Sequence, residues 1–321
     1  MKESTPAGLR HRQPSPIQPA TDPLLTTAKK IENKIEDNFR RVVDWNDLAP
    51  WRRDNAFIHT GYRPDSNSYS GSFASLSYLH NESVNIWSHL LGSLFFLIFG
   101  IFLYHEVVPR YASATTADLR AFGCFFTGAV ACMGMSATYH ALSNHSPAVA
   151  RWGNKLDYTG IVLLIVGSYV PALYYGFDCH PHLMTLYLSI ISLLGIGCGV
   201  VSWLEVFRTP AWRPFRAAMF VGLGTSGVVP VVHGLVIYGR AELERRMSLS
   251  WLLAHGAMYV FGAFLYAARW PERSYPKRFD IWGSSHQIFH LFVVMAAATH
   301  LYGMGRAFDY HHGPEAACLA N

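Results

Sequence analysis

Charged side chains are scarce in this sequence: Asp, Glu, Lys and Arg make up 15% of its 321 residues, whereas a soluble domain carries about 25%. Hydrophobic residues make up 51%, and most charges lie near the N-terminus or in short connecting stretches. The remaining long, almost uncharged segments indicate a protein that crosses a membrane several times. The net charge of +5 predicts no nucleic-acid partner, because basic residues beside membrane spans commonly set topology.

Cysteine is also rare, and none of the five cysteines forms a C-x-x-C pair. A cysteine zinc knuckle and a disulfide-rich scaffold are therefore not indicated. Cys124, Cys132 and Cys198 fall in apolar stretches, where we expect small core residues. Cys179 and Cys318 would lie on the same outer side, which permits a disulfide that nothing else in the sequence indicates.

The N-terminal stretch lacks the apolar region of a secretory signal and is rich in Pro, Ser and Thr. We expect residues 1–22 to be a disordered leader. Residues 23–80 are predicted to form a cytoplasmic amphipathic helix and connector. Residues 81–305 follow as a seven-helix membrane domain, and residues 306–321 as an outer tail.

Seven apolar stretches each reach the length of about 20 residues that a helix needs to cross hydrocarbon. They run over Val84–Tyr104, Leu119–Leu142, Leu156–Tyr175, His182–Phe207, Phe215–Ile237, Leu249–Ala268 and Gly283–Gly303. The fifth is the weakest, because three glycines and Pro230 predict a kink. The predicted fold class is all-α, a seven-transmembrane helix bundle.

Lys and Arg in the connecting segments indicate the orientation of this bundle. With the N-terminus inside, the three inner connections hold nine of these residues, and the outer segments hold six. Inner loops of membrane proteins are enriched in Lys and Arg. We therefore predict a cytoplasmic N-terminus and an outer C-terminus.

In this topology several polar residues of three different spans fall at one membrane depth. Ser136 and His140 lie near the cytoplasmic end of the second span, and Asp157 lies at the start of the third. His286 and His290 lie in the first two turns of the seventh span. Nothing in the composition requires this convergence, so we expect it to serve chemistry.

The residue types predict a zinc site. His286 and His290 share one helix face, because residues four apart are one turn apart. With His140 they form a three-histidine set with an open fourth position, which suits zinc and a bound water whose pKa falls to about 7. Asp157 would act as general base, and Ser136 would orient the water or a substrate carbonyl.

Each of these residues also has a plainer interpretation. Two histidines four apart can simply face an interfacial loop, His140 can be a core residue, and Asp157 can cap a helix or pair with Lys155. However, an ionisable residue within a span costs about 2.5–3.5 kcal/mol on insertion scales. The coincidence of four such groups at one depth therefore favours a metal site.

The stretches "LHNESVNIWSHLLG", "SATYHALSNHS", "LDYTGI" and "HQIFH" occur in that order along the chain. In them the sequence resembles the progestin and adipoQ receptor family, over roughly residues 46–305. That family includes the adiponectin receptors, fungal zinc-homeostasis proteins and, more distantly, haemolysin III proteins, and we expect a fungal member.

The resemblance implies zinc near the inner leaflet, held by His140, His286 and His290, with Ser136 and Asp157 matching the remaining motif positions. For adiponectin receptors it suggests hydrolysis of ceramide, and for the fungal relatives lipid and zinc homeostasis. Three further motif residues, Glu82, Asn85 and His89, have no assigned role. For Glu82 structural anchoring is favoured, with a bridge to the loops or to a residue behind the metal ligands as the alternative. For His89 we expect packing or support of a metal ligand.

Three functions follow from this reading of the sequence. The first is a zinc-dependent hydrolase that acts on a ceramide-like lipid amide and takes part in lipid and zinc homeostasis signalling, in the plasma membrane or an endomembrane. The second is a receptor with a purely structural zinc and an extracellular ligand, which the long outer loops permit. A zinc transporter ranks last, because the outer halves of the spans lack a ladder of carboxylates.

Overall fold

A computed structural model describes residues 27, 29, 41–110, 113–314 and 318 of the chain. The predicted disordered leader lies outside the described residues, and so does almost all of the predicted amphipathic helix. Residues 41–321 form one compact unit, and everything below concerns that unit.

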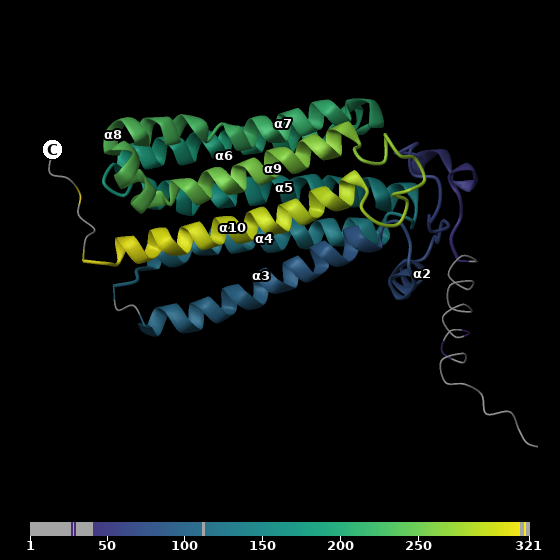
Figure 1. The fold of residues 1–321 in the computed structure, drawn as a ribbon, viewed down its shortest axis with the longest axis horizontal. Coiled ribbons are helices and arrows are strands. Elements are labelled where there is room, and N and C mark those ends of the chain that lie inside the picture. The colour runs from purple at the N-terminus through teal and green to yellow at the C-terminus, as the bar shows by residue number, and fades with distance from the viewer. Residues whose placement is uncertain (1–26, 28, 30–40, 111–112, 315–317, 319–321) are drawn as a thin grey trace, which may run out of the picture. The chain divides into compact units, whose positions relative to one another are not determined.

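The described residues contain seven segments that are long and apolar enough to cross a membrane. Six are single helices and the fifth consists of two: α3 (Ser83–Arg110), α4 (Thr116–Leu142), α5 (Pro147–Gly176), α6 (Pro181–Trp203), α7 (Arg213–Thr225) with α8 (Val228–Met247), α9 (Leu249–Ala268) and α10 (Ser285–His311). They lie side by side as a bundle (Figure 1). No strand occurs in the described part of the chain, which confirms the predicted all-α, seven-span fold.

The predicted kink of the fifth span is confirmed. The helix stops at Thr225 and resumes at Val228. The Tyr169 hydroxyl of α5 donates a hydrogen bond of 2.6 Å to the carbonyl of Gly224, beside the break. Farther along, Gly239 has a φ of 71°, a left-handed conformation that glycine adopts without a steric penalty. The fifth span therefore packs as short rigid pieces.

Helices α4 and α5 approach each other closely through small residues. A Cβ atom on Gly128 would lie 2.6 Å from the carbonyl oxygen of Leu163, and one on Gly160 would lie 2.7 Å from the Cα of Cys132. Such small residues allow backbones to pack tightly where lipid offers no hydrophobic driving force. This contact fixes the depth at which the C-terminal end of α4 faces the N-terminal end of α5.

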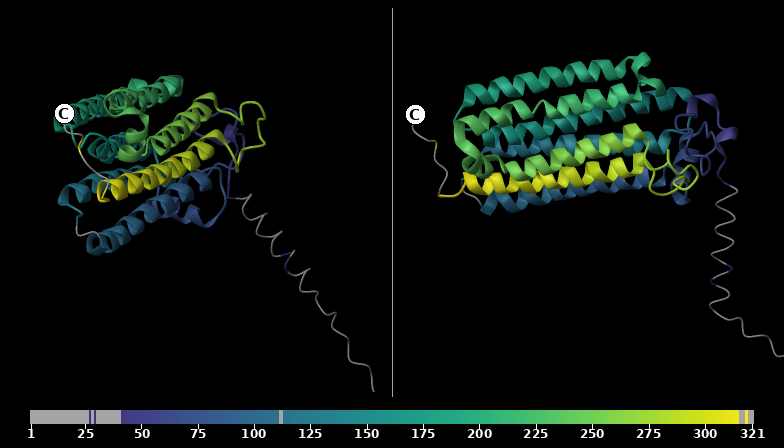
Figure 2. Two further views of the ribbon diagram at one scale, coloured as in Figure 1. Left: turned by 60° about the vertical axis from the view of Figure 1, so that its left-hand side comes forward. Right: turned by 45° about the horizontal axis from the view of Figure 1, so that its top comes forward.

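The segment before α3 is tied to the loop between α9 and α10. The side chain of Asn55 donates to Glu272 at 3.1 Å, and the backbone and hydroxyl of Thr60 both donate to Asp280 at 2.8 Å. This segment and this loop lie at the same end of the bundle (Figure 2). The two together form a polar layer over the predicted cytoplasmic ends of the helices.

At the opposite end, Cys179 and Cys318 form a disulfide across 139 residues of sequence. The disulfide joins the turn after α5 to the C-terminal segment. Disulfides persist in oxidising compartments and are rare in the cytosol. The pairing therefore agrees with an outer C-terminus, an orientation that stays a prediction.

This orientation can be tested by labelling intact cells with a membrane-impermeant maleimide. We expect no labelling of Cys179 in the wild-type chain and strong labelling in Cys318→Ser, because loss of the partner leaves a free thiol on the outer surface. The double variant Cys179→Ser/Cys318→Ser gives the background from the other thiols. Labelling of Cys179 only after the cells are permeabilised would contradict the predicted orientation.

Candidate metal centre

The structure brings together the three histidines that the sequence predicts as metal ligands. His140 lies in the last turn of α4, and His286 and His290 lie in the first two turns of α10. One ring nitrogen of each lies within 4.8 Å of one ring nitrogen of each of the others. Their ring centroids are 4.8–4.9 Å apart. One ion could therefore contact all three rings.

The chemistry of this cluster suits a metal ion. His140 and His290 are both 2% exposed, and Nε2 of His140 is buried without a hydrogen-bond partner. Leaving a buried polar group unpaired costs about 1–3 kcal/mol. Imidazole nitrogens brought within 4.8 Å of one another are the donor set that zinc commonly binds in proteins. The three residues fit zinc.

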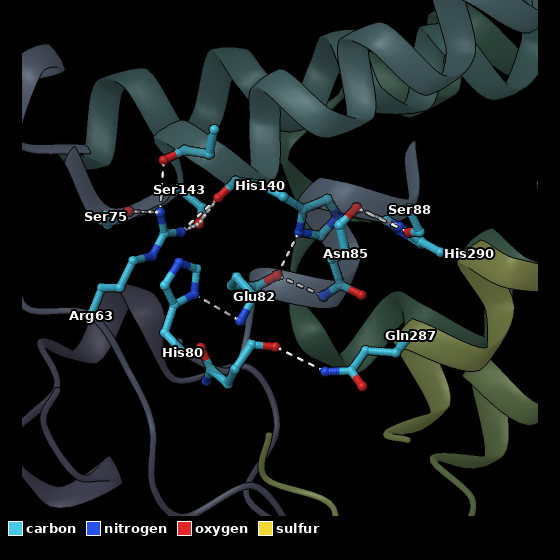
Figure 3. A network of polar contacts seen from close by, with 12 residues as sticks. Arg63, Ser75, His80, Glu82, Asn85, Ser88, His140, Ser143, Gln287 and His290 are labelled. Atoms are coloured by element: carbon cyan, nitrogen blue, oxygen red, sulfur yellow. Dashed lines mark hydrogen bonds and ion pairs between the residues drawn. The ribbon is translucent and has the colours of Figure 1, made fainter. Parts of the chain in front are cut away.

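Glu82, directly before α3, and Asn85, in its first turn, contact two of these histidines (Figure 3). Glu82 Oε2 lies 2.7 Å from Nδ1 of His140, and the side-chain amide of Asn85 donates to the same oxygen at 2.6 Å. Nδ1 of His290 lies 3.2 Å from the backbone carbonyl oxygen of Asn85. Burial raises the pKa of Glu82, but its interactions with neighbouring groups, including the hydrogen bonds to His140 and Asn85, hold it below its usual value.

The sequence did not single out these contacts, because anchoring was the favoured role for Glu82 and contact with a metal ligand only the alternative. The signal that could have found them is the spacing of Glu82 and Asn85, two polar residues three positions apart at the start of an apolar span. Residues three apart lie on one helix face, and that face had to meet another polar group or remain unpaired in the membrane.

His89 is close to the cluster but faces it differently. Its ring stacks on that of His290, with centroids 3.6 Å apart and planes 6° apart. An imidazole binds a metal in its own ring plane, so an ion in the plane of His290 would lie well out of the plane of His89. His89 therefore packs against a predicted ligand, which agrees with the packing role expected for it.

Asp157 and Ser136 lie beside the histidines. Both line the same cavity as His286 and His290. The Asp157 carboxylate lies close enough to His140 for an electrostatic interaction, and the Ser136 hydroxyl is buried without a hydrogen-bond partner among the described residues. Lys155 does not pair with Asp157 as the plainer interpretation allowed. Its ammonium instead lies 5.1 Å from the ring centre of Trp152 and 5.5 Å from that of Trp203.

A large cavity of about 1020 Å³ is lined in part by His286, His290, Asp157 and Ser136. Its walls come mainly from α5, α7, α8 and α9, and they are largely apolar, including Ile161, Leu164, Phe220, Val231, Leu252 and Val260. The cavity extends to Met247 and Leu249 near the opposite end of the bundle. Its volume and lining are those of a site for a hydrophobic small molecule.

The polar layer anchors the helix ends that carry the histidines. Arg63 is fully buried and donates to the carbonyl oxygen of His140 at 2.6 Å and to that of Ala141 at 2.9 Å. Burial lowers the pKa of Arg63 to about 10, so the guanidinium is still charged at neutral pH. Glu272 accepts from the backbone N–H of Ser285 at 2.8 Å, which satisfies an orphan donor at the start of α10.

Two other histidines pair far from this cluster. His255 of α9 and His300 of α10 have ring centroids 4.7 Å apart. His300 follows His290 by ten residues on one helix, a rise of about 15 Å. The pair therefore stands apart from the candidate metal centre.

Comparison with known proteins identifies relatives over most of the chain. Residues 77–301 match the family described as haemolysin-III related. The chain is 44% identical over 283 residues to the "Adiponectin receptor protein" of Drosophila melanogaster, covering 88% of this chain and 63% of that protein. It is 42% identical over 280 residues to the "ADIPOR-like receptor IZH2" of Saccharomyces cerevisiae, covering 87% of this chain and 88% of that protein.

A plant relative gives the same picture of the fold. The chain is 35% identical over 296 residues to "Heptahelical transmembrane protein 3" of Arabidopsis thaliana, covering 81% of this chain and 86% of that protein. The chain spans less than two thirds of the length of the fruit fly protein. Together with the seven apolar helices, the plant relative identifies an integral, multi-pass membrane protein.

Substitution of the clustered histidines tests their capacity to hold a metal. We expect His140→Gln, His286→Gln and His290→Gln each to weaken binding of Zn²⁺ or Co²⁺. The loss should exceed the roughly 10–100-fold that follows when a ligand loses only its hydrogen-bond partner. His300→Gln, on the same helix as two of them, is the matched control and should bind as the wild type does. Metal content and chelator competition on purified protein measure this. Equal affinity in all four variants would contradict a metal site here.

Proposed function

The chain belongs to the haemolysin-III-related family, and from this we propose that it is an adiponectin-receptor-like membrane protein in which a zinc centre hydrolyses a ceramide-like lipid amide. The observation that carries the proposal is the position of the histidine cluster. It lies beside Asp157 and Ser136 at the edge of an apolar cavity of about 1020 Å³. Metal-binding groups, a carboxylate and space for an acyl chain are thereby combined in one site.

His140, His286 and His290 would hold the ion. When bound, zinc supplies a Lewis acid for the amide carbonyl and lowers the pKa of a coordinated water to about 7. Three protein ligands would leave such an ion free to bind a water or substrate as well. The chain's other polar groups then position the reactants and move protons.

Asp157 is suited to hold the proton that the attacking water gives up. It is 9% exposed and lies in the cavity wall, where a carboxylate retains its basicity. In the reaction the water oxygen bonds to the carbonyl carbon, the C–N bond breaks, and the leaving amine takes a proton. The products are a fatty acid and an amine, and Asp157 is the residue able to pass the proton to that amine.

Ser136 lies one helical turn before His140, on the same face of α4. Its hydroxyl is buried and has no hydrogen-bond partner within the described part of the protein. We assign it the role of orienting the water or the carbonyl through a hydrogen bond. The apolar cavity walls would hold the acyl chain and exclude bulk water from the amide.

A receptor with a structural zinc is the second candidate. It is favoured by the polar layer, because Arg63 holds the end of α4, and Glu272, which caps α10, is bonded to Asn55. A shift of the ligand-bearing helices would be transmitted directly to this layer. The relatives in fruit fly and yeast are also named receptors.

Asp157→Asn separates the two candidates. It keeps the size of the side chain but removes the base, so we expect release of fatty acid from ceramide to fall by about 10²–10⁴-fold while zinc content is unchanged. Asp280→Asn is the matched control, because that buried carboxylate contacts Thr60 in the polar layer and should leave hydrolysis unaffected. A zinc-loaded wild-type protein that releases no fatty acid would contradict the hydrolase and favour the structural role.

A further inference from the structure

Glu82 stands out because it touches a predicted metal ligand from a different helix without being a ligand itself. We propose that Glu82 is a positioning residue of the zinc centre, which fixes the tautomer and ring orientation of His140. The inference rests on the proposed zinc site but not on the proposed hydrolysis.

The tautomer of His140 follows from the donor and acceptor inventory. Glu82 Oε2 lies 2.7 Å from Nδ1 of His140. An ionised carboxylate can only accept hydrogen bonds, so Nδ1 must carry the proton. A neutral imidazole then has its lone pair on Nε2, which is the atom left buried without a partner. Such carboxylate–histidine–metal chains recur in metal centres, where they orient the ring and raise its basicity.

Glu82 is itself held in place by neighbouring groups. The Asn85 side chain donates to Oε2 at 2.6 Å, and the backbone N–H of Glu82 donates to Nδ1 of His80 at 3.1 Å. Asn85 also holds a second ligand, because its backbone carbonyl lies 3.2 Å from Nδ1 of His290. Glu82 and the first turn of α3 thus orient imidazoles from both α4 and α10 (Figure 3).

The charge of Glu82 has a second effect on the centre. A divalent ion held only by neutral imidazoles would be an uncompensated double charge at the edge of the hydrocarbon, which is unfavourable. Glu82 places a carboxylate directly against one of these imidazoles.

A plainer role for Glu82 would be to join α3 to α4. That role predicts that substitution of Glu82 lowers the stability of the whole fold. Metal binding would then weaken only to the extent that the fold is lost. The structure offers a matched control on the same pair of helices, since Ser93 of α3 donates a hydrogen bond of 3.1 Å to the carbonyl of Val130 in α4. Ser93 contacts no predicted metal ligand.

The experiment measures zinc affinity by chelator competition on the purified full chain in lipid nanodiscs. We expect Glu82→Ala to weaken binding by about 10–100-fold. Glu82→Gln should lie between this variant and the wild type, because its amide oxygen still accepts from Nδ1 but carries no charge. Ser93→Ala should bind zinc with wild-type affinity.

Two further readouts separate positioning from folding. The visible absorption spectrum of the Co²⁺-substituted protein should change in Glu82→Ala, because a ligand ring has lost its fixed orientation. The thermal midpoint of metal-free Glu82→Gln should match that of metal-free wild type.

Wild-type zinc affinity and a wild-type Co²⁺ spectrum in both Glu82 variants would overturn this inference alone. So would equal losses of affinity in the Glu82 variants and in Ser93→Ala. A wild-type protein that binds no zinc would overturn the proposed zinc centre together with this inference. Absence of amide hydrolysis would leave this inference standing, because its readout is metal affinity.

Discussion

Unpaired imidazole nitrogens and carboxylates at the edge of a membrane are unfavourable, and the arrangement of this protein depends on how they are compensated. His140, His286 and His290 converge from two helices, and Glu82 and Asp157 interact with His140 from two others. A buried polar network in which some groups lack hydrogen-bond partners is less stable than an apolar core. A divalent cation shared by the three rings would satisfy the nitrogen that is otherwise without a partner.

The rest of the fold holds these groups at one depth. Glycines at the contact of α4 with α5 fix the two helices close together, so that His140 and Asp157 stay within interaction distance. Arg63 binds the end of α4 and Glu272 binds the start of α10. Both are in the polar layer at one end of the bundle. Rigid support of this kind is what a site needs to keep its geometry.

The seven spans and the three histidines were accessible from the sequence, because each depends on local patterns. Apolar length predicts a span, the spacing of four places His286 beside His290, and alternation of span direction puts His140 at the same depth. The contact between Glu82 and His140 joins residues 58 apart, and no local pattern specifies such a pairing. The same holds for Lys155, whose contact with Trp203 depends on how α6 packs against α5. The cavity likewise depends on the broken fifth span. The sequence predicts that this span is broken, but it does not predict the path that its two helices take.

The most direct test of this account is zinc K-edge X-ray absorption on the purified protein, which reports the ligands of the ion itself. We expect nitrogen or oxygen neighbours at about 2.0–2.1 Å, with the outer scattering pattern of three imidazoles. A sulfur neighbour at about 2.3 Å, or fewer than three imidazoles, would contradict a centre formed by His140, His286 and His290.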